Sequence, residues 1–375
     1  MIFHHGFWVG CVLIVTLGCG SKQADDDHTP AVGGDAGTGG TSAGGSSLGG
    51  TGAVGGAGKP AGAGGAGAAG AGAAGTGQGA AGAGAAGAGT DGTCTKTFGT
   101  PELLIGDTPG VLRQSLAVTG DDLELYYEER RAGAAHIMLR KRSDRNAAFG
   151  DATELDSSIW SWCTPIEDPS IDVSDDGLRL YLTCVDTDTP NGDGGYTSSP
   201  IRVAERPTRA AAFSLNPTAA GIANVSLSVT QDELTAFWSD FSQSITPRSL
   251  MATRPSKAEP FGSPVPIPGL QDNVRNPELA NDGLHLFGSI ELSDKTYDVV
   301  MFTRPSPGAS FAPATVADLV LEHTFDSVDD PSTSAIEGTS DYTPTLSGDC
   351  KSLYFMRRTV TTGGNATSEI FVAKR

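Results

Sequence analysis

The sequence predicts an all-β fold: a five-bladed β-propeller of four-stranded antiparallel blades, preceded by a disordered N-terminal linker. A hairpin pattern that recurs five times after residue 98, and an Arg–Phe spacing that recurs with it, predict the blades. A third observation concerns closure. The last copy of the repeat stops after its third strand, and the missing piece stands at the other end of the folded part, as Phe98–Leu104. We therefore expect a closed ring whose last blade is completed by the N-terminal strand.

The first residues indicate export. The apolar run Phe7–Leu17 is only about eleven residues long, too short to span a bilayer, so residues 1–18 are interpreted as a signal peptide. Gly18 directly before Cys19 resembles a bacterial lipoprotein signal, in which the cysteine becomes the lipid-bearing first residue. Thr16 in place of Leu, and a leading segment without Lys or Arg, depart from that pattern. Cleavage as an ordinary secretory signal is the alternative.

Residues 19–93 are expected to be a lipidated N-terminus and a flexible tether. From about Gly33 to Gly92 the chain is almost wholly Gly, Ala, Ser and Thr, which cannot bury enough apolar surface to offset the entropy of ordering. A coil of ~60 such residues has a reach of about 45 Å. The folded domain is then 94–375, and we expect it at the cell envelope, on the outer membrane, facing the periplasm or the cell surface.

The charge balance excludes one class of partner. The formal net charge is −19, whereas proteins that bind nucleic acids need clustered Lys and Arg. We therefore expect no nucleic-acid partner, membrane contact only through the lipid anchor, and a monomer.

Each repeat opens with the same hairpin. Two alternating apolar runs flank a turn that begins with Asp and continues with Gly or another turn-tolerant residue, which is a hairpin signal. The turn aspartates are Asp121, Asp176, Asp232, Asp282 and Asp349. A Leu and then an aromatic residue follow on the second strand, as suits a sheet packed between two neighbours.

The second half of each repeat places Phe at a fixed distance after Arg. The pairs are Arg142 and Phe149, Arg206 and Phe213, Arg254 and Phe261, and Arg304 and Phe311, with Arg375 and Phe98 as the fifth. Four short strands per copy, about 50 residues per repeat and no helical periodicity indicate propeller blades.

These hairpins resemble the propeller repeats of the TolB-like, WD-repeat-like family of exported bacterial proteins. The resemblance covers Phe98 to Arg375 and implies a non-catalytic platform for binding a protein or another ligand. The turns Asp232-Glu233 and Asp349-Cys350 lack the glycine of the pattern, which leaves their turn type open.

Four cysteines, Cys94, Cys163, Cys184 and Cys350, remain in the folded part. An even count in an exported protein favours disulfides, and four cysteines allow three pairings. The blade register places Cys163 and Cys184 at one face and Cys94 and Cys350 at the other. We therefore predict the bonds Cys163–Cys184 and Cys94–Cys350.

No catalytic constellation is recognisable, so the sequence favours a protein that is not an enzyme. The folded part has His136, His285 and His323, none of them at metal-ligand spacing or beside a nucleophile. The repeating aspartates are turn formers by position. The alternative is a glycan-binding or glycan-hydrolysing propeller that uses carboxylates at its central channel.

Three features exceed what the repeat requires: an acidic loop, a long insertion and a pair of tryptophans. Asp186, Asp188, Asn191 and Asp193 offer closely spaced oxygen ligands, so calcium is a possible cofactor against a plain acidic turn, and we expect no other. The long connection Leu319–Ser340 is the largest insertion, and it leaves room for a degenerate extra blade.

Aromatic and basic side chains are the remaining candidates. Trp160 and Trp162 could stack on a sugar or a partner, or else cap the core. The sequence places Arg357 and Arg358 in the final blade's loop, where they either bind a partner or pair with surface carboxylates. The sequence thus favours binding of an envelope protein or a glycan, whose identity it leaves open.

Overall fold

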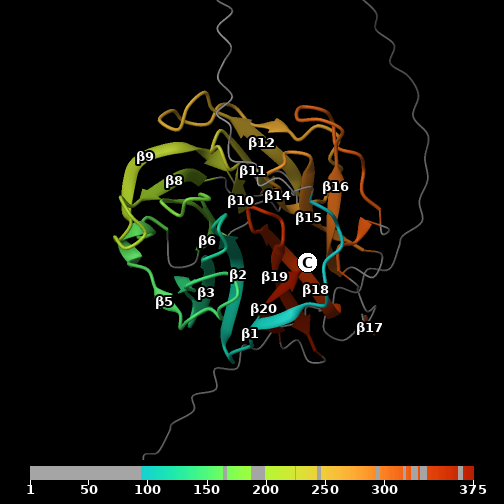
Figure 1. Cartoon of the computed structure of the whole chain (residues 1–375), viewed down its shortest axis with the longest axis horizontal. Coiled ribbons are helices and arrows are strands. Elements are labelled where there is room, and N and C mark those ends of the chain that lie inside the picture. Colours follow the sequence, from blue (N-terminus) through green and yellow to red (C-terminus); the bar gives the residue numbers. More distant parts are fainter. Residues whose placement is uncertain are drawn as a thin grey trace, which may run out of the picture. The chain divides into compact units, whose positions relative to one another are not determined.

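The computed structural model describes residues 94–375 except 164–166, 187–198, 224, 243–245, 293–295, 316–317, 322–327, 330–335 and 362–365. Five antiparallel sheets are arranged around a common axis (Figure 1). Helical conformation in the described ranges is confined to the short 3-10 turn η1 (Ser157–Ile159) and to Asp318, and no helix there has the length and hydrophobicity of a membrane span. The predicted fold class is therefore confirmed. The predicted signal peptide, Cys19 and the tether lie outside the described residues.

Blades are numbered in chain order. Blade 1 contains β2 (Val111–Val118), β3 (Glu124–Arg131), β4 (Ala134–Lys141) and β5 (Thr153–Glu154). Blade 2 contains β6 (Glu167–Val173), β7 (Arg179–Asp186), β8 (Ser199–Glu205) and β9 (Ser214–Ala223). Blade 3 contains β10 (Val225–Val229), β11 (Thr235–Asp240), β12 (Arg248–Thr253) and β13 (Val265–Pro266). Blade 4 contains β14 (Arg275–Leu279), β15 (His285–Glu291) and β16 (Tyr297–Thr303). Blade 5 contains β17 (Val328–Asp329), β18 (Ile336–Leu346), β19 (Ser352–Val360), β20 (Ala366–Lys374) and β1 (Glu102–Ile105).

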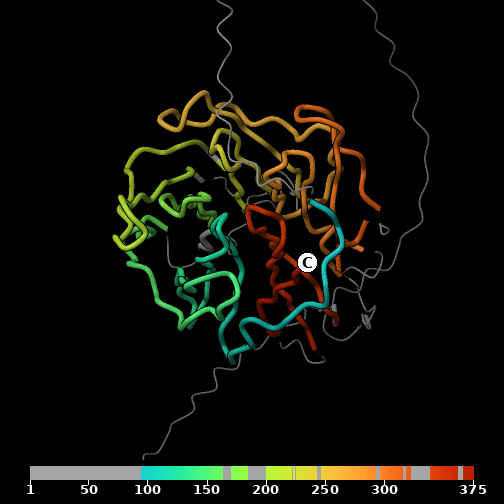
Figure 2. Tube along the Cα trace, viewed as in Figure 1, coloured from blue at the N-terminus to red at the C-terminus, as the bar shows by residue number. Residues whose placement is uncertain are grey.

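The ring closes as the repeat predicts. Each innermost strand contacts the innermost strands of both neighbours, in the order β2, β6, β10, β14, β18 and back to β2. Strand β1 pairs antiparallel with β20, with Glu102 opposite Val372. Figure 2 shows the cyan N-terminal segment beside the red C-terminal strands. The last blade therefore joins both ends of the described chain.

Blades 4 and 5 differ from the expected four-strand plan. After Phe311 the chain follows the outer edge of β16 through isolated backbone hydrogen bonds, such as Ala312 N–H to Thr303 O (2.8 Å), without forming a fourth ladder. The insertion 319–340 contributes β17, which adds a fifth strand to blade 5. Among the described residues there is no extra blade.

The first turn of every blade has the same backbone conformation. The residue after the turn aspartate has φ between 56° and 69° in all five copies, although three of the five are not glycine. These residues are Asp122, Gly177, Glu233, Gly283 and Cys350. The aspartate holds the turn by accepting a backbone N–H two residues on, as Asp282 does from Leu284 (2.8 Å). The turns that lack glycine are therefore of the same kind, and the aspartates are turn formers as predicted.

The recurrent Arg and Phe form one contact, repeated around the ring. In all five pairs the guanidinium lies over the phenylalanine ring, 4.4–4.6 Å from its centroid. In blades 1 to 4 the Arg Nε also donates to the carbonyl of the left-handed turn residue, at 2.6–2.7 Å. The cation–π contact holds the end of each third strand against the phenylalanine segment, and the hydrogen bond holds it against the first turn in blades 1 to 4.

Buried charges link three of the five blade junctions. A tyrosine on the second strand of one blade donates to a carboxylate. An arginine of the next blade around the ring pairs with that carboxylate or donates to the tyrosine hydroxyl. The sets are Tyr126, Glu124 and Arg206; Tyr181, Glu233 and Arg254; and Tyr354, Asp122 and Arg142. The other two junctions have Phe237 and Phe287 at the tyrosine position. Burial and the adjacent carboxylates raise the pKa of all three hydroxyls, which therefore stay protonated donors.

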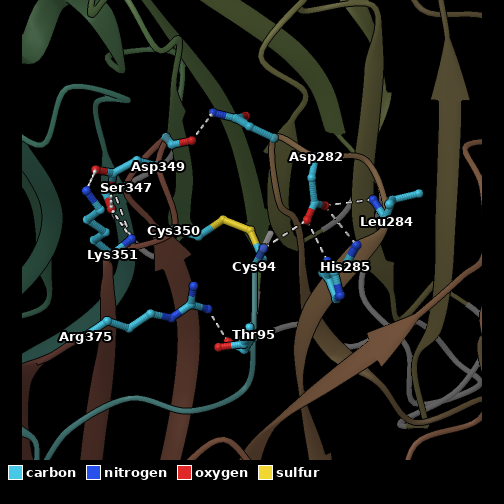
Figure 3. The surroundings of a disulfide bond; sticks show 12 residues. Cys94, Thr95, Asp282, Leu284, His285, Ser347, Asp349, Cys350, Lys351 and Arg375 are labelled. Carbon is cyan, nitrogen blue, oxygen red and sulfur yellow. Dashed lines mark hydrogen bonds and ion pairs between the residues drawn. A yellow bond between two sulfur atoms is a disulfide. The ribbon is translucent and has the colours of Figure 1, made fainter. Parts of the chain in front are cut away.

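Both predicted disulfides are present. Cys94 is bonded to Cys350 with the Cα atoms 5.5 Å apart, and Cys163 to Cys184 with the Cα atoms 5.8 Å apart. Figure 3 shows the first bond, which joins the segment before β1 to the first turn of blade 5. It therefore fastens the ring at its closure. Disulfides of this kind are typical of proteins that leave the cytoplasm.

Candidate functional site

The central channel is closed at the face that carries the first turns. The residue just before each turn aspartate points to the axis, and these residues bond to one another across blades. Gly348 N–H donates to Gly120 O (2.9 Å), and Gly120 N–H to Asp175 O (3.2 Å). The Asn281 amide donates to the Asp175 carboxylate and to Gly348 O, both at 3.1 Å. A Cβ on Gly120 would lie 2.5 Å from Asp175, so only glycine allows this closure.

The opposite face is hollowed by a cavity of about 400 Å³ at the mouth of the channel. All five blades contribute to its lining. The lining residues are Leu112, Arg113, Gln114, Ser115, Glu128, Ser170, Val225, Ser226, Phe241, Arg275, Asn276, Tyr342, Thr343, Met356, Arg358 and Ser368. A concave site of this size with arginines, amides, hydroxyls and two aromatic rings suits a polar ligand such as a sugar.

Several of these lining residues lie at β-bulges in the innermost strands. The pairing register shifts at the same place in β2, β10, β14 and β18, just where the cavity begins. Three bulge residues, Ser226, Asn276 and Thr343, have φ of 62°, 53° and 49° although none is glycine. Such conformations cost on the order of 1 kcal/mol each and concentrate at functional sites. The sequence analysis missed them; Pro277 and Pro344, inside predicted strands, were the available signal.

Below the cavity the channel narrows to a shaft of about 20 Å³, and the Glu278 carboxyl lines it. The cavity and the shaft share the lining residues Ser115, Ser170, Ser226, Asn276 and Thr343, so they are continuous. A space of this size is large enough for one water molecule.

Glu278 is one of three acidic side chains whose charges act on one another, and of the three it is the one among the lining residues of the shaft. Burial and the charge of Asp175 raise the pKa of Glu278 to about 7, against hydrogen bonds from Ser228 and the Leu346 N–H that favour the ionised form. Burial and the charge of Glu278 likewise raise the pKa of Asp172, although its carboxylate accepts Val229 N–H at 2.6 Å. Burial also raises the pKa of Asp175. Near neutral pH this group can hold and release a proton.

The structure places the predicted tryptophans in the core. Trp160 is 6% exposed and packs with Ile159, between blades 1 and 2. Trp162 is half-buried, donates its indole N–H to Ile159 O (3.1 Å) and lies under Arg202. Of the two roles expected for Trp160, its burial fits the cap on the core, because its ring fills space between sheets. Neither residue lines the cavity.

The predicted arginines lie in strand β19, not in a loop. Arg357 forms a two-pronged ion pair with Asp341, with both N–O distances 2.8 Å, and lies against Phe355 and Phe371. Arg358 is exposed and lines the cavity. Alternation along the strand sends the two side chains to different environments. Of the residues predicted for ligand binding, Arg358 is the one at the described cavity.

Two further candidates give no site in the described structure. Of the proposed calcium ligands, Asp188, Asn191 and Asp193 lie outside the described residues, and Asp186 ends β7. Among the described residues, Cys94, Asp282 and His285 bring potential metal-ligating atoms within 4.8 Å of one another (Figure 3). The Cys94 sulfur is already bonded to Cys350, so this group offers only two ligands.

Comparison with known proteins shows the fold alone. No family model matches the sequence, and no curated protein is similar to it. An α-L-arabinofuranosidase from Podospora anserina, solved with cellotriose, is 11% identical, with a TM-score of 0.47 over 75% of this chain and 98% of that one. A GH43 enzyme from Xanthomonas citri, solved with xylotriose, is 12% identical, with a TM-score of 0.46 over 72% and 89%. TolB from Acinetobacter baumannii is 14% identical, with a TM-score of 0.36; the chain covers 54% of it.

The expectation that the chain is not an enzyme is corrected by this comparison, since glycoside hydrolases stand beside TolB among structures with its fold. The expectation rested on an incomplete set of candidate residues. The sequence search weighed histidine-based sites and the repeating turn aspartates, whereas Asp172 and Glu278 lie outside both sets. The TolB-like resemblance holds for the propeller fold, and it does not separate TolB from the hydrolases.

Proposed function

We propose that this protein binds a glycan in the cavity at the open mouth of the channel and hydrolyses it with channel carboxylates. The observation that supports the proposal is the shaft carboxyl Glu278, whose pKa is raised to about 7, directly beneath a polar cavity of about 400 Å³. A carboxyl group that is still protonated near neutral pH is what a glycosidase uses as its acid.

The proposed roles follow from position. Glu278 donates a proton to the glycosidic oxygen through one water in the shaft, which is an accepted reach for a general acid. Glu128 is the one carboxylate among the described residues that line the cavity, and we assign it the role of the base that activates the attacking water. Both of its carboxylate oxygens are buried in this structure, so this role requires the side chain to turn toward the cavity. The water oxygen bonds to the anomeric carbon while Glu128 takes one of its protons. The bond to the leaving oxygen breaks, and the proton from Glu278 converts that oxygen to a hydroxyl.

The test is a screen for new reducing ends. Purified full-length protein is incubated with envelope and plant polysaccharides, and reducing ends and bound sugar are measured separately. Release of reducing ends, lost in Glu128→Gln, supports hydrolysis. Binding without release of reducing ends would support glycan binding and refute catalysis. If no polysaccharide gives either signal, the proposal is contradicted.

We also propose that the propeller is lipid-anchored at the cell envelope through Cys19, with the Gly/Ala-rich segment as its tether. The two disulfides support an exported location. Cys19→Ala is expected to move the protein from the membrane fraction to the soluble fraction of fractionated cells. If the variant stays in the membrane fraction, another attachment must hold it.

A further inference from the structure

The cavity is rich in arginine although the protein as a whole is acidic. The formal net charge is −19, yet Arg113, Arg275 and Arg358 line the cavity and Glu128 is the carboxylate among the lining residues. In a protein with this charge balance, arginines are not expected to gather in one hollow by chance. The ligand is therefore expected to carry negative charge.

Arg113 has a structural role. Its guanidinium is 4% exposed, pairs with Glu129 (3.1 Å) and donates to Ser368 O (2.7 Å). These contacts join blade 1 to blade 5. Arg113 therefore supports the cavity wall, and its charge is already balanced.

Arg275 and Arg358 are different. Neither guanidinium forms an ion pair or a hydrogen bond with any residue that the structure describes. Arg275 lies over the Tyr297 ring (4.3 Å from its centroid) and near that of Phe241 (5.1 Å), which orients its plane without balancing its charge. The nearby carboxylate Glu291 accepts from Tyr297 Oη at 2.9 Å. Two positive groups at the cavity thus lack a partner within the described chain.

Both arginines lie near the Tyr342 side chain. The Tyr297 and Tyr342 rings are 5.2 Å apart, so Arg275, Tyr297 and Tyr342 form one stack that reaches the cavity. Burial raises the pKa of the Tyr342 hydroxyl, while the charges of Arg275 and Arg358 both oppose that rise. Both guanidinium groups therefore lie within electrostatic range of Tyr342, Arg275 on β14 and Arg358 on β19.

We infer that Arg275 and Arg358 form a carboxylate-binding subsite beside Tyr342, so that the glycan bound in the cavity contains uronic acid residues. The inference rests on the proposed function. The planar guanidinium matches a carboxylate with two parallel hydrogen bonds, and it is more weakly hydrated than an ammonium. Asn276, on the neighbouring bulge, also lines the cavity, and its side-chain amide donates to the Ser226 hydroxyl at 2.5 Å.

The test compares one sugar chain in acidic and neutral form. Binding of oligogalacturonate, of the same oligosaccharide with its carboxyl groups reduced to alcohols, and of a sulfated oligosaccharide is measured by calorimetry on the full-length protein. Arg358→Gln and Arg275→Gln are each expected to weaken oligogalacturonate binding about tenfold and to leave the reduced form unchanged. Lys374→Gln is the matched control, because this exposed cation lies at the other end of the β19–β20 pair.

The outcomes separate the two proposals. If the reduced oligosaccharide binds as tightly as the acidic one, or if Arg358→Gln weakens both equally, the carboxylate subsite is refuted while glycan binding stands. Equal affinity for the sulfated chain would refute the choice of carboxylate. If none of these oligosaccharides binds, the carboxylate subsite is refuted, and the polysaccharide screen alone decides whether the cavity binds a glycan. Arg358 is exposed, so its variant is expected to keep the wild-type melting temperature even if Arg275→Gln unfolds.

Discussion

Replacing Cys94 and Cys350 by alanine is expected to lower the free energy of unfolding by about 5 kcal/mol. The bond closes a loop of 256 residues, nearly the whole propeller, so its removal gives the unfolded chain a large amount of conformational entropy. A loss of this size is comparable to the entire stability of many domains. The measurement is urea unfolding of the variant and of the oxidised wild type, at matched m-values.

The second disulfide provides the control. Cys163 and Cys184 are 21 residues apart, so the same model gives a smaller loss, about 3 kcal/mol, when both are replaced by alanine. The position of the first bond adds a second expectation: β1 should detach from β20 before the rest of the ring unfolds. Equal losses in the two double variants would contradict the entropic argument, and uniform hydrogen exchange in β1 and β19 would contradict the local one.

The blades could be predicted because the repeat determines them locally. A turn aspartate, an Arg–Phe pair and alternating strands are needed in every copy, so five copies reinforce one another. The same redundancy predicted the closure and both disulfides. It failed at the outer edge of blade 4, where Phe311 begins a segment that keeps its place by its ring and by single hydrogen bonds.

The site could not be predicted in the same way, because it is built from departures from the repeat. Asp172 and Glu278 occupy the position before the apolar residue that opens the turn, where blades 3 and 5 have Ser228 and Thr345. A carboxylate seen once or twice in a chain carries no periodic signal. Its chemistry arises only when the ring brings blades 2 and 4 to one axis, more than 100 residues apart in the chain.

The bulges illustrate the same limit. Asn276 and Thr343 read as ordinary strand residues, and each is followed by a proline that could equally mark a strand end. Their left-handed backbone depends on the pairing register with β15 and β19, which is a property of the folded blade. Trp160 shows a different limit, because its large ring is equally suited to a core or to a binding surface and the sequence left both roles open.

Glu278→Gln is expected to abolish most of the proposed hydrolysis, by 10²- to 10⁴-fold, the usual contribution of a general acid. The same residue should shape the pH profile of the wild type. Glu278 must be protonated to donate, and burial beside Asp175 raises its pKa to about 7, so activity is expected to fall as the pH rises above about 7. Asp175→Asn removes a neighbouring negative charge, so the pKa of Glu278 falls and the alkaline limb moves to lower pH.

The same ionisation gives a readout that does not depend on any substrate. Between the ordinary value of 4.5 and about 7 the folded protein binds a proton at Glu278 that the unfolded chain has lost, so wild-type stability should decrease as the pH rises through this window. The full shift corresponds to about 3 kcal/mol at most. Glu278→Gln cannot ionise, so near pH 8 it should be more stable than wild type, and near pH 4.5 about equal. A variant whose stability falls in parallel with wild type from pH 5 to 8 would show that Glu278 titrates normally, and the proton donor would then have to be sought elsewhere in the channel.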